Sequence, residues 1–171
     1  SSGTVTTAQA NTLSAATSAV VTATISDGDM ATLAGLTETG NAYTITITDA
    51  SVAASALNTL DGKTSVAINA SNITTLTGAA ADLNTAYTAN ANGSISGLNN
   101  EAVTLSDTSL AVSVLNDLDG NTSGTINANS INTLSGTAAD LITAYDSGGI
   151  TGLGNEACLL YTSDAADDDH C

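Results

Sequence analysis

The chain lacks most of the side chains that usually build active sites and basic binding surfaces. Its 171 residues include no proline, phenylalanine, tryptophan or arginine, and Lys63 is the one lysine. Without large aromatic anchors, the core has to be built from leucine, isoleucine, valine and alanine. The formal net charge is −16, and that negative field repels nucleic acid and anionic membrane surfaces. We therefore expect no nucleic-acid partner.

The sequence also lacks features of membrane proteins, of signal peptides and of enzymes. No apolar run approaches the roughly 18 residues of a membrane span, so we expect no membrane insertion. Residues 1–13 carry no signal-peptide pattern and no initiator methionine, which favours an internal piece of a longer protein. Cysteine and histidine occur only at Cys158, His170 and Cys171. Before residue 158 no set of nucleophile, base and orienting group can be assembled, so we predict that the chain is not an enzyme.

What the chain does contain is an internal repeat. Residues 57–87 match residues 115–145 at 21 of 31 positions with a constant offset of 58, and "ISGLNNEA" (95–102) returns as "ITGLGNEA" (150–157). A diverged relative of the same pattern lies near the start. We divide the chain into a diverged partial repeat (1–48), repeat unit 1 (49–106), a truncated repeat unit 2 (107–157) and a tail (158–171).

Each unit begins with a strand pattern and continues with a helix pattern. Residues 41–49 and 101–107 alternate apolar and small polar side chains and predict strands. In the segment after residue 107, the helical spacing predicts a short amphipathic helix, with Asp107 or Ser109 suited to cap its start and Gly120 its end. Its apolar face consists of Leu110, Val114, Leu115 and Leu118.

The second half of a unit repeats the alternation. Residues 123–129 predict a strand with Ile126 inward, and residues 137–145 predict a helix with Ala138, Leu141 and Tyr145 on one face. Thr137 and Asp140 have capping-box spacing. Ala79, at the equivalent position of unit 1, lacks that cap.

Two strand–helix steps per 58 residues predict an α/β fold, a repeat solenoid with a parallel sheet and short helices in a leucine-rich-repeat-like layout. Strands stack about 4.8 Å apart whereas helices prefer about 8–10 Å, so we expect a curved or twisted array. Asn58 and Asn116 recur between core leucines. They either bond neighbouring turns in an asparagine ladder or face water on the helix flank.

The segments "LNTLDGKTS", "TLTGAAADLNTAY" and "ISGLNNEAVTLSD" resemble the Thr-, Ala- and Asn-rich repeats of very large secreted or surface-attached, adhesin-like or hemolysin-like proteins of aquatic bacteria. The resemblance covers residues 1–157. It implies an extracellular or cell-surface location and a structural or adhesive role as a spacer or stalk. The implied partners are adjacent repeats of the parent chain, surface glycans or other cells. It carries over no catalytic residue.

The strongest calcium candidates are Asp117, Asp119 and Asn121, which alternate around Gly120 as oxygen ligands do in calcium loops. The equivalent positions of unit 1 include Lys63, which favours a helix end over a repeated metal site. Ca²⁺ is the one cofactor that the pattern suggests.

Asp27 and Asp29 raise the same question, with a solvated turn as the other interpretation. The alternative function is accordingly a carbohydrate- or calcium-binding module on the solenoid face.

Two further patterns have ordinary explanations. Thr44, Thr46 and Thr48 would line one strand face, where flat threonine arrays can bind ice, but the aligned strand lacks the pattern and the β-propensity of threonine explains it better. Tyr87 and Tyr145 recur at equivalent helix ends, which predicts packing over the neighbouring turn.

The tail departs from the repeat at one residue. After "GLNNEA" unit 1 continues as "VTLSD", whereas after "GLGNEA" the chain continues as "CLLYTSDAADDDHC". "CLLYTSDAAD" resembles a translated sequencing-adapter scar, so we exclude residues 158–171 from fold reasoning. The alternatives are a metal cluster, although the cysteines and the histidine lack zinc spacing, or a disulfide. An array cut at both ends exposes apolar faces, so we expect it to self-associate or to be marginally stable.

Overall fold

The computed structural model describes residues 3–161, in which short helices alternate with short strands. The helices are α1 (Thr7–Ala15), α2 (Met30–Leu33), α3 (Ala54–Asp61), α4 (Ala80–Asn92), α5 (Val112–Asn121) and α6 (Ala138–Asp146). The first strands are β1 (Gly3–Val5), β2 (Thr22–Ile25), β3 (Ala42–Thr44), β4 (Ser51–Ala53), β5 (Ile68–Asn69) and β6 (Thr75–Gly78). The later strands are β7 (Ile95–Ser96), β8 (Ala102–Leu105), β9 (Ser109–Ala111), β10 (Ile126–Asn127), β11 (Thr133–Gly136), β12 (Ile150–Thr151) and β13 (Ala157–Leu160).

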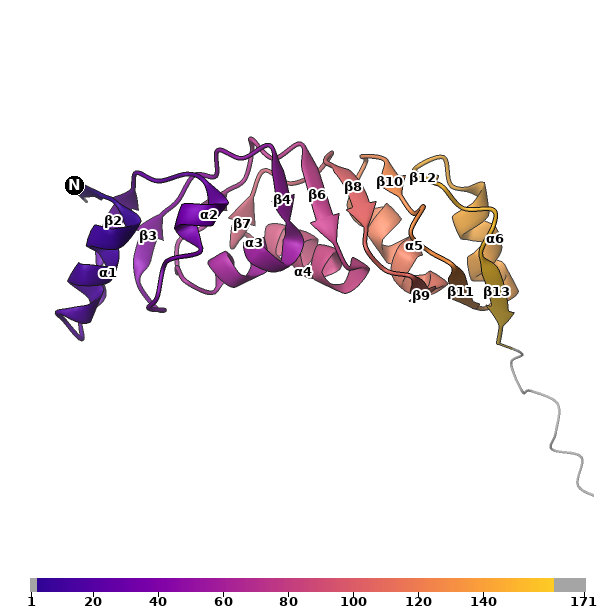
Figure 1. Cartoon of the computed structure of the whole chain (residues 1–171), viewed down its shortest axis with the longest axis horizontal. Helices are drawn as coiled ribbons and strands as arrows, with labels where there is room; N and C mark the ends of the chain where they lie inside the picture. The colour runs from indigo at the N-terminus through magenta and orange to yellow at the C-terminus, as the bar shows by residue number, and fades with distance from the viewer. Residues whose placement is uncertain (1–2, 162–171) are drawn as a thin grey trace, which may run out of the picture.

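Figure 1 shows an elongated, gently arched molecule whose elements follow one another in chain order, from α1 at one end to α6 and β13 at the other. Within residues 3–161 the paired strands are all parallel, and paired residues are 20 to 27 positions apart. The fold is therefore α/β with parallel sheets and short helices, as predicted. We call the stretch from one strand to its partner strand a coil.

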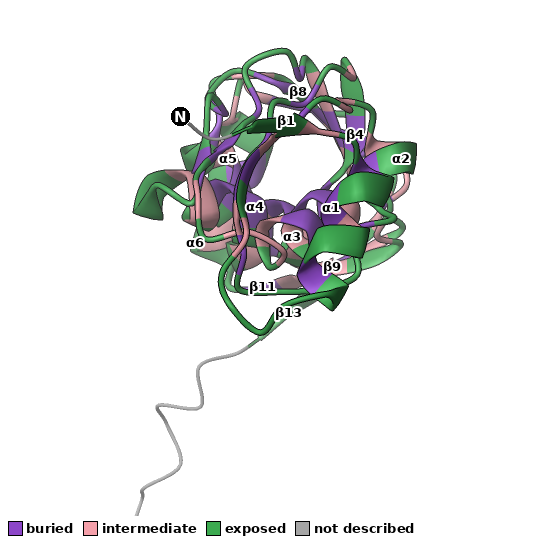
Figure 2. Ribbon diagram, turned by 90° about the vertical axis from the view of Figure 1, so that its left-hand side faces the viewer, coloured by how far each residue is buried: buried purple, intermediate pink, exposed green. Residues whose placement is uncertain are grey.

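The strands form several sheets, which lie at different positions around the long axis of the molecule. One sheet has the order β12-β10-β8-β6-β4, and the others are β1-β2-β3, β13-β11-β9 and β5-β7. Strand β8 links two coils, because it pairs with β6 along one edge and with β10 along the other. The chain then crosses to β9, which Figure 2 places on the opposite side of the molecule from β8. This crossing moves the sheet around the axis.

Positions 58 residues apart in the sequence adopt the same local structure. Strand β4 and helix α3 correspond to β9 and α5, and strand β6 and helix α4 correspond to β11 and α6. From β4 to β9 the chain completes two coils, through β6 and β8, and then makes the crossing. Successive helices α3, α4, α5 and α6 pack against one another along the molecule.

The core runs along the inside of the coils and is mainly aliphatic. Ile45 and Ile47 are fully buried, whereas Thr44, Thr46 and Thr48 alternate with them on the outside. The helices contribute a second set of buried side chains: Ala54, Leu57, Leu60, Ala80, Leu83, Ala86, Leu115 and Leu118. Figure 2, a view along the axis, shows the buried residues on the inner side of the ribbon.

Regular strands are shorter than the sequence predicts. Within 41–49, the strand β3 covers three residues, and two isolated bridges join Asn41 to Thr64 and Thr46 to Asn69. Within 123–129, only Ile126–Asn127 pairs, with Ile126 buried as predicted. Pairing is interrupted because each coil has to bend at its corners to close around the core.

The predicted start of the helix after residue 107 is wrong. Ser109–Ala111 forms strand β9, so α5 begins at Val112 and neither Asp107 nor Ser109 caps it. Leu110 lies on the strand and not on the helix. The reason is tertiary, because β9 pairs with β11 of the next coil and that pairing holds the segment extended.

The predicted end of the same helix is also displaced. Helix α5 passes through Gly120 and ends at Asn121, with Thr122 in extended conformation as the C-cap. Leu115 and Leu118 lie fully buried on the predicted apolar face.

The predicted start of α6 is correct. Thr137 is the N-cap, and its Oγ1 accepts a 3.1 Å hydrogen bond from the backbone N–H of Asp140. The predicted apolar face is buried only at Leu141, because Ala138 and Tyr145 are exposed at this end of the molecule.

Aspartate side chains cap helices of the preceding coil. The Asp107 carboxylate accepts a 2.8 Å hydrogen bond from the Ala80 N–H at the start of α4. Asp49 accepts a 2.6 Å bond from the Met30 N–H at the start of α2 in the same way. Ala79 has no capping side chain, as predicted. The cap of α4 is therefore supplied by the next coil.

Asparagine side chains bond each helix to the following helix. Asn58 on α3 donates to the Asp82 carbonyl at 2.9 Å, and Asn116 on α5 donates to the Asp140 carbonyl at 3.0 Å. Asn84 on α4 makes the corresponding bond to α5 at 3.2 Å. The ladder interpretation is confirmed, with the backbone of the next helix as acceptor.

Replacing Asn116 tests this ladder. Asn116→Ala leaves the Asp140 carbonyl without its donor and should lower the free energy of unfolding by about 1 to 2 kcal/mol. Asn58→Ala should have a smaller effect, because the Asn58 Oδ1 is itself buried without a partner. Asn92, exposed at the end of α4, is the control, and its alanine variant should stay within about 0.5 kcal/mol of the parent. Urea unfolding measures all three, and equal effects of Asn116→Ala and Asn92→Ala would contradict the ladder.

Candidate functional site

The predicted calcium residues of unit 2 all lie on helix α5. Residues two apart on a helix point in different directions, so Asp117 and Asp119 do not share a face. Asp119 accepts a 2.7 Å hydrogen bond from the Ser147 hydroxyl, and Asn121 donates to the Asn84 side chain at 3.0 Å. Asp117 is exposed. The helix therefore does not bring these three side chains together.

The other two candidates are helix caps. Asp27 Oδ2 accepts a 2.7 Å hydrogen bond from the Thr7 N–H at the start of α1, so the solvated-turn interpretation is wrong for Asp27. Asp29 is the N-cap of α2 and accepts a 2.9 Å bond from the Thr32 N–H. That bond lowers the pKa of the exposed Asp29 carboxyl. Both carboxylates already serve backbone donors of a helix terminus.

No group of three or more aspartate, glutamate, histidine or cysteine side chains converges within residues 3–161. Cys158 lies exposed on β13, with its Sγ 3.2 Å from the Tyr145 hydroxyl. His170 and Cys171, the other members of the predicted metal cluster or disulfide, lie outside the described residues. The predicted boundary at residue 158 falls inside β13, because Ala157–Leu160 pairs with β11.

A buried polar pair joins α4 to the segment before β8. Glu101 is buried, and the Tyr87 hydroxyl donates to its Oε2 at 3.3 Å. The Asn99 N–H donates to Oε1 at 3.0 Å. Burial and the negative charge of Glu101 raise the pKa of Tyr87 to about 12. The phenol therefore stays protonated at neutral pH and acts as a hydrogen-bond donor.

The next coil covers this pair. The Thr122 Oγ1 lies 3.4 Å from the Glu101 carbonyl oxygen, and the Ser123 N–H donates to the Asn99 carbonyl at 2.9 Å. A Cβ at Gly124 would collide with the Glu101 carbonyl. Glycine at this position therefore permits the backbone to approach closely and exclude water from the carboxylate.

The equivalent pair in unit 2 lies at the end of the molecule. The Tyr145 hydroxyl donates to Glu156, and the Gly154 N–H donates to Glu156 Oε2 at 2.8 Å. Hydrogen bonds with Cys158 and Glu156 raise the pKa of Tyr145. Tyr145 is 43% exposed, whereas Tyr87 is 4% exposed. The predicted packing over a neighbouring turn is thus present for Tyr87 and not for Tyr145.

Burial of Glu101 was not predicted from the sequence. The available signal is the recurrence of a single glutamate in "NNEA" and "GNEA", directly before an alternating strand, with a tyrosine 14 positions earlier in unit 1. An acidic residue at this position is unusual, because the core is otherwise aliphatic. Only the fold shows that Tyr87 and Asn99 donate hydrogen bonds to the Glu101 carboxylate.

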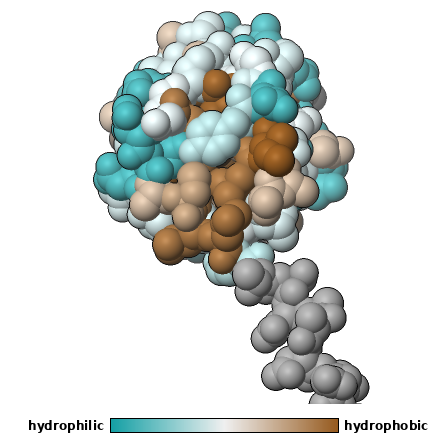
Figure 3. Space-filling view, turned by 90° about the vertical axis from the view of Figure 1, so that its right-hand side faces the viewer, coloured by the Kyte–Doolittle hydropathy of each residue, from teal (hydrophilic) through white to brown (hydrophobic). Residues whose placement is uncertain are grey.

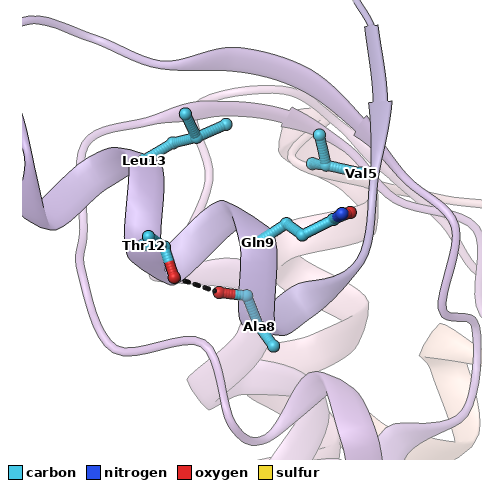
Figure 4. A pocket seen from close by; sticks show the side chains of 5 residues that line it. All are labelled: Val5, Ala8, Gln9, Thr12 and Leu13. Atoms are coloured by element: carbon cyan, nitrogen blue, oxygen red, sulfur yellow. Dashed lines mark hydrogen bonds between the residues drawn. The ribbon is translucent and has the colours of Figure 1, made fainter.

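The surface hollows offer little chemistry. A hollow of about 390 Å³ beside α1 is lined by Val5, Ala8, Gln9, Thr12 and Leu13. Figure 4 shows the Thr12 hydroxyl donating to the Ala8 carbonyl, at 3.0 Å, so that polar group is already used. A smaller hollow of about 130 Å³ lies between α2 and α3. The hollow beside α1 presents mainly apolar side chains and has no titratable group in its lining.

Comparisons with protein-family models, with curated proteins and with solved structures find no match. Within residues 3–161 the helices are too short and too polar for any of them to cross a lipid bilayer.

Substitutions can distinguish a capping role of these aspartates from a calcium-binding role. Asp27→Ala leaves the Thr7 N–H at the start of α1 without its acceptor, while Thr6 remains the N-cap, and should destabilise the protein by about 1 kcal/mol. Asp117→Ala on the exposed face of α5 should be neutral or slightly stabilising, because alanine is the better helix former and a carboxylate near a helix C-terminus is unfavourable. Urea unfolding with and without calcium chloride measures both. A calcium-dependent stabilisation that either variant removes would contradict the cap assignment.

The two glutamates form a matched pair of test positions. Glu101→Ala leaves the Tyr87 hydroxyl and the Asn99 N–H without an acceptor inside the core and should cost about 2 to 3 kcal/mol. Glu156→Ala makes the same change at the exposed end and should cost no more than about 0.5 kcal/mol. Thermal or urea unfolding compares them, and similar losses would show that burial of Glu101 contributes nothing.

Proposed function

We propose that this chain is a section of an α/β solenoid that acts as a non-enzymatic spacer or adhesive stalk in a large extracellular bacterial surface protein. Its main partners are then adjacent repeats of the parent chain, and any adhesion is to surface glycans or other cells. Nucleic acid and membrane insertion play no part in this role.

The observation that carries the proposal is the recurrence of the same bonds between successive coils. Parallel strand pairs, the asparagine bonds of Asn58, Asn84 and Asn116, and the carboxylate caps all join one coil to the next. Each coil thus holds its immediate neighbours, which is the arrangement that lets a solenoid grow without limit. A chain built in this way gains length with every unit while its cross-section stays constant.

The outer surface fits a spacer. Side chains on the outward strand faces are small and uncharged, as in the row Thr77, Thr104 and Asn127 across β6, β8 and β10. Thr104 is exposed, and Thr77 and Asn127 are half-buried. The chain as a whole carries a formal net charge of −16. Like charge keeps neighbouring copies apart at low ionic strength and keeps long arrays dispersed.

Length measurements on extended arrays test the proposal. One or two additional copies of residues 49–106 are inserted after residue 106 of the full chain, and small-angle X-ray scattering measures each product. Two coil steps per unit at a strand spacing of about 4.8 Å should add on the order of 10 Å to the maximum dimension for each copy. The cross-sectional radius should not change.

A compact particle whose length does not grow with copy number would contradict the spacer role. The same proteins are melted with and without calcium chloride. A rise in melting temperature with calcium would instead favour the calcium-binding alternative.

A further inference from the structure

Exposed apolar side chains gather at the two ends of the molecule. At the α6 end, Ile142 on α6 is 61% exposed, and Leu159 and Leu160 on β13 are exposed as well. Figure 3 shows apolar surface across this end. At the opposite end Leu13 is 47% exposed and lies with Val5 at the hollow of Figure 4. The two surfaces correspond to the two sides of an interface that is found inside the molecule.

The first coil is of the same kind as the coils of α3 and α5. The residues before these three helices, Thr6, Ala53 and Ala111, are their N-caps, and an asparagine follows at the same distance in each: Asn11, Asn58 and Asn116. The loop after each helix contains the same dipeptide, at Thr17–Ser18, Thr64–Ser65 and Thr122–Ser123. Helix α1 therefore corresponds to α5.

Inside the molecule, the helix that precedes α5 is α4. Asn84 of α4 donates to the Val114 carbonyl of α5 at 3.2 Å, and Leu118 of α5 is fully buried. The loop after α5 covers Tyr87 and Glu101. Helix α6 is of the same kind as α4, being placed 58 residues after it. The two ends of the chain therefore repeat the two sides of the α4–α5 interface: α6 at one end corresponds to α4, and α1 at the other end corresponds to α5.

We propose that the α6 end of one copy of this chain docks onto the α1 end of a second copy and reproduces the α4–α5 interface. Leu13 of the second copy takes the place of Leu118. The loop that begins at Thr17 takes the place of the Thr122 loop and covers Tyr145 and Glu156. At Ile142, which stands where α4 has Asn84, an apolar contact replaces the asparagine hydrogen bond.

The interface is heterologous, because two different surfaces meet. Such contacts continue from copy to copy and form open rows unless the rotation closes a ring. Copies with a formal net charge of −16 repel one another, so added salt should strengthen the association by screening this repulsion. The docking is argued from the equivalence of the coils and not from the spacer role; in a longer chain, adjacent repeats would occupy the same two surfaces.

Sedimentation of the full chain over a range of concentrations tests the proposal. The parent should show a mass that rises with concentration beyond the dimer, and more strongly at 1 M than at 0.1 M sodium chloride. Leu13→Asp and Ile142→Asp each place a charge in one half of the interface, and each variant alone should sediment as a monomer under all these conditions. Circular dichroism confirms that both variants keep the parent fold.

The control is Val20→Asp. Val20 is 65% exposed, but its equivalents Ala67 and Thr125 remain exposed inside the array, so this variant should associate like the parent. Mixing Leu13→Asp with Ile142→Asp restores one intact interface per pair, and the mixture should stop at a dimer.

A monomeric parent at millimolar concentration in high salt would overturn the proposal. Continued association of either single variant, or a mixture that remains monomeric, would overturn it equally. These outcomes leave the scattering test of the spacer role untouched, because that test measures length within one chain.

Discussion

Consecutive coils of this chain are held at the spacing of paired strands, and the helices have to fit that spacing. Parallel strands lie about 4.8 Å apart, whereas helix axes ordinarily lie about 8–10 Å apart. The helices meet this constraint with small buried side chains, such as Ala54, Ala80 and Ala86, which allow backbones to approach. The arch of the molecule in Figure 1 takes up part of the remaining mismatch. Close backbones in turn place a helix carbonyl within reach of an asparagine on the preceding helix.

The same closeness explains why polar groups are satisfied between coils. Asp107 caps α4 from the following coil, and Thr122 and Ser123 cover Glu101 from the coil after α4. A coil therefore becomes complete only when its neighbour is in place. At the α6 end the neighbour is not part of the described chain, and the equivalents Tyr145 and Glu156 stand near the surface.

Much of the architecture could be predicted from spacing. Strand alternation correctly assigned Ile126 to the inside, and helical spacing did the same for Leu115 and Leu118. The Thr137 cap was found from its local pattern. The errors share one cause. Ser109 was assigned to a helix, and Asp27 was interpreted as a turn residue or calcium ligand, because their bonding partners lie one coil away. Local patterns carry no information on a partner 20 or more residues distant.

The sequence by itself determined the class of elements, the 58-residue period and the aliphatic core, because side-chain periodicity follows directly from the geometry of strands and helices. Only the tertiary structure decided which carboxylates cap which helices, that Glu101 is buried against Tyr87, and that the two ends carry the two halves of an internal interface. Each of these depends on the register between coils, and register is set by strand pairing across the whole coil.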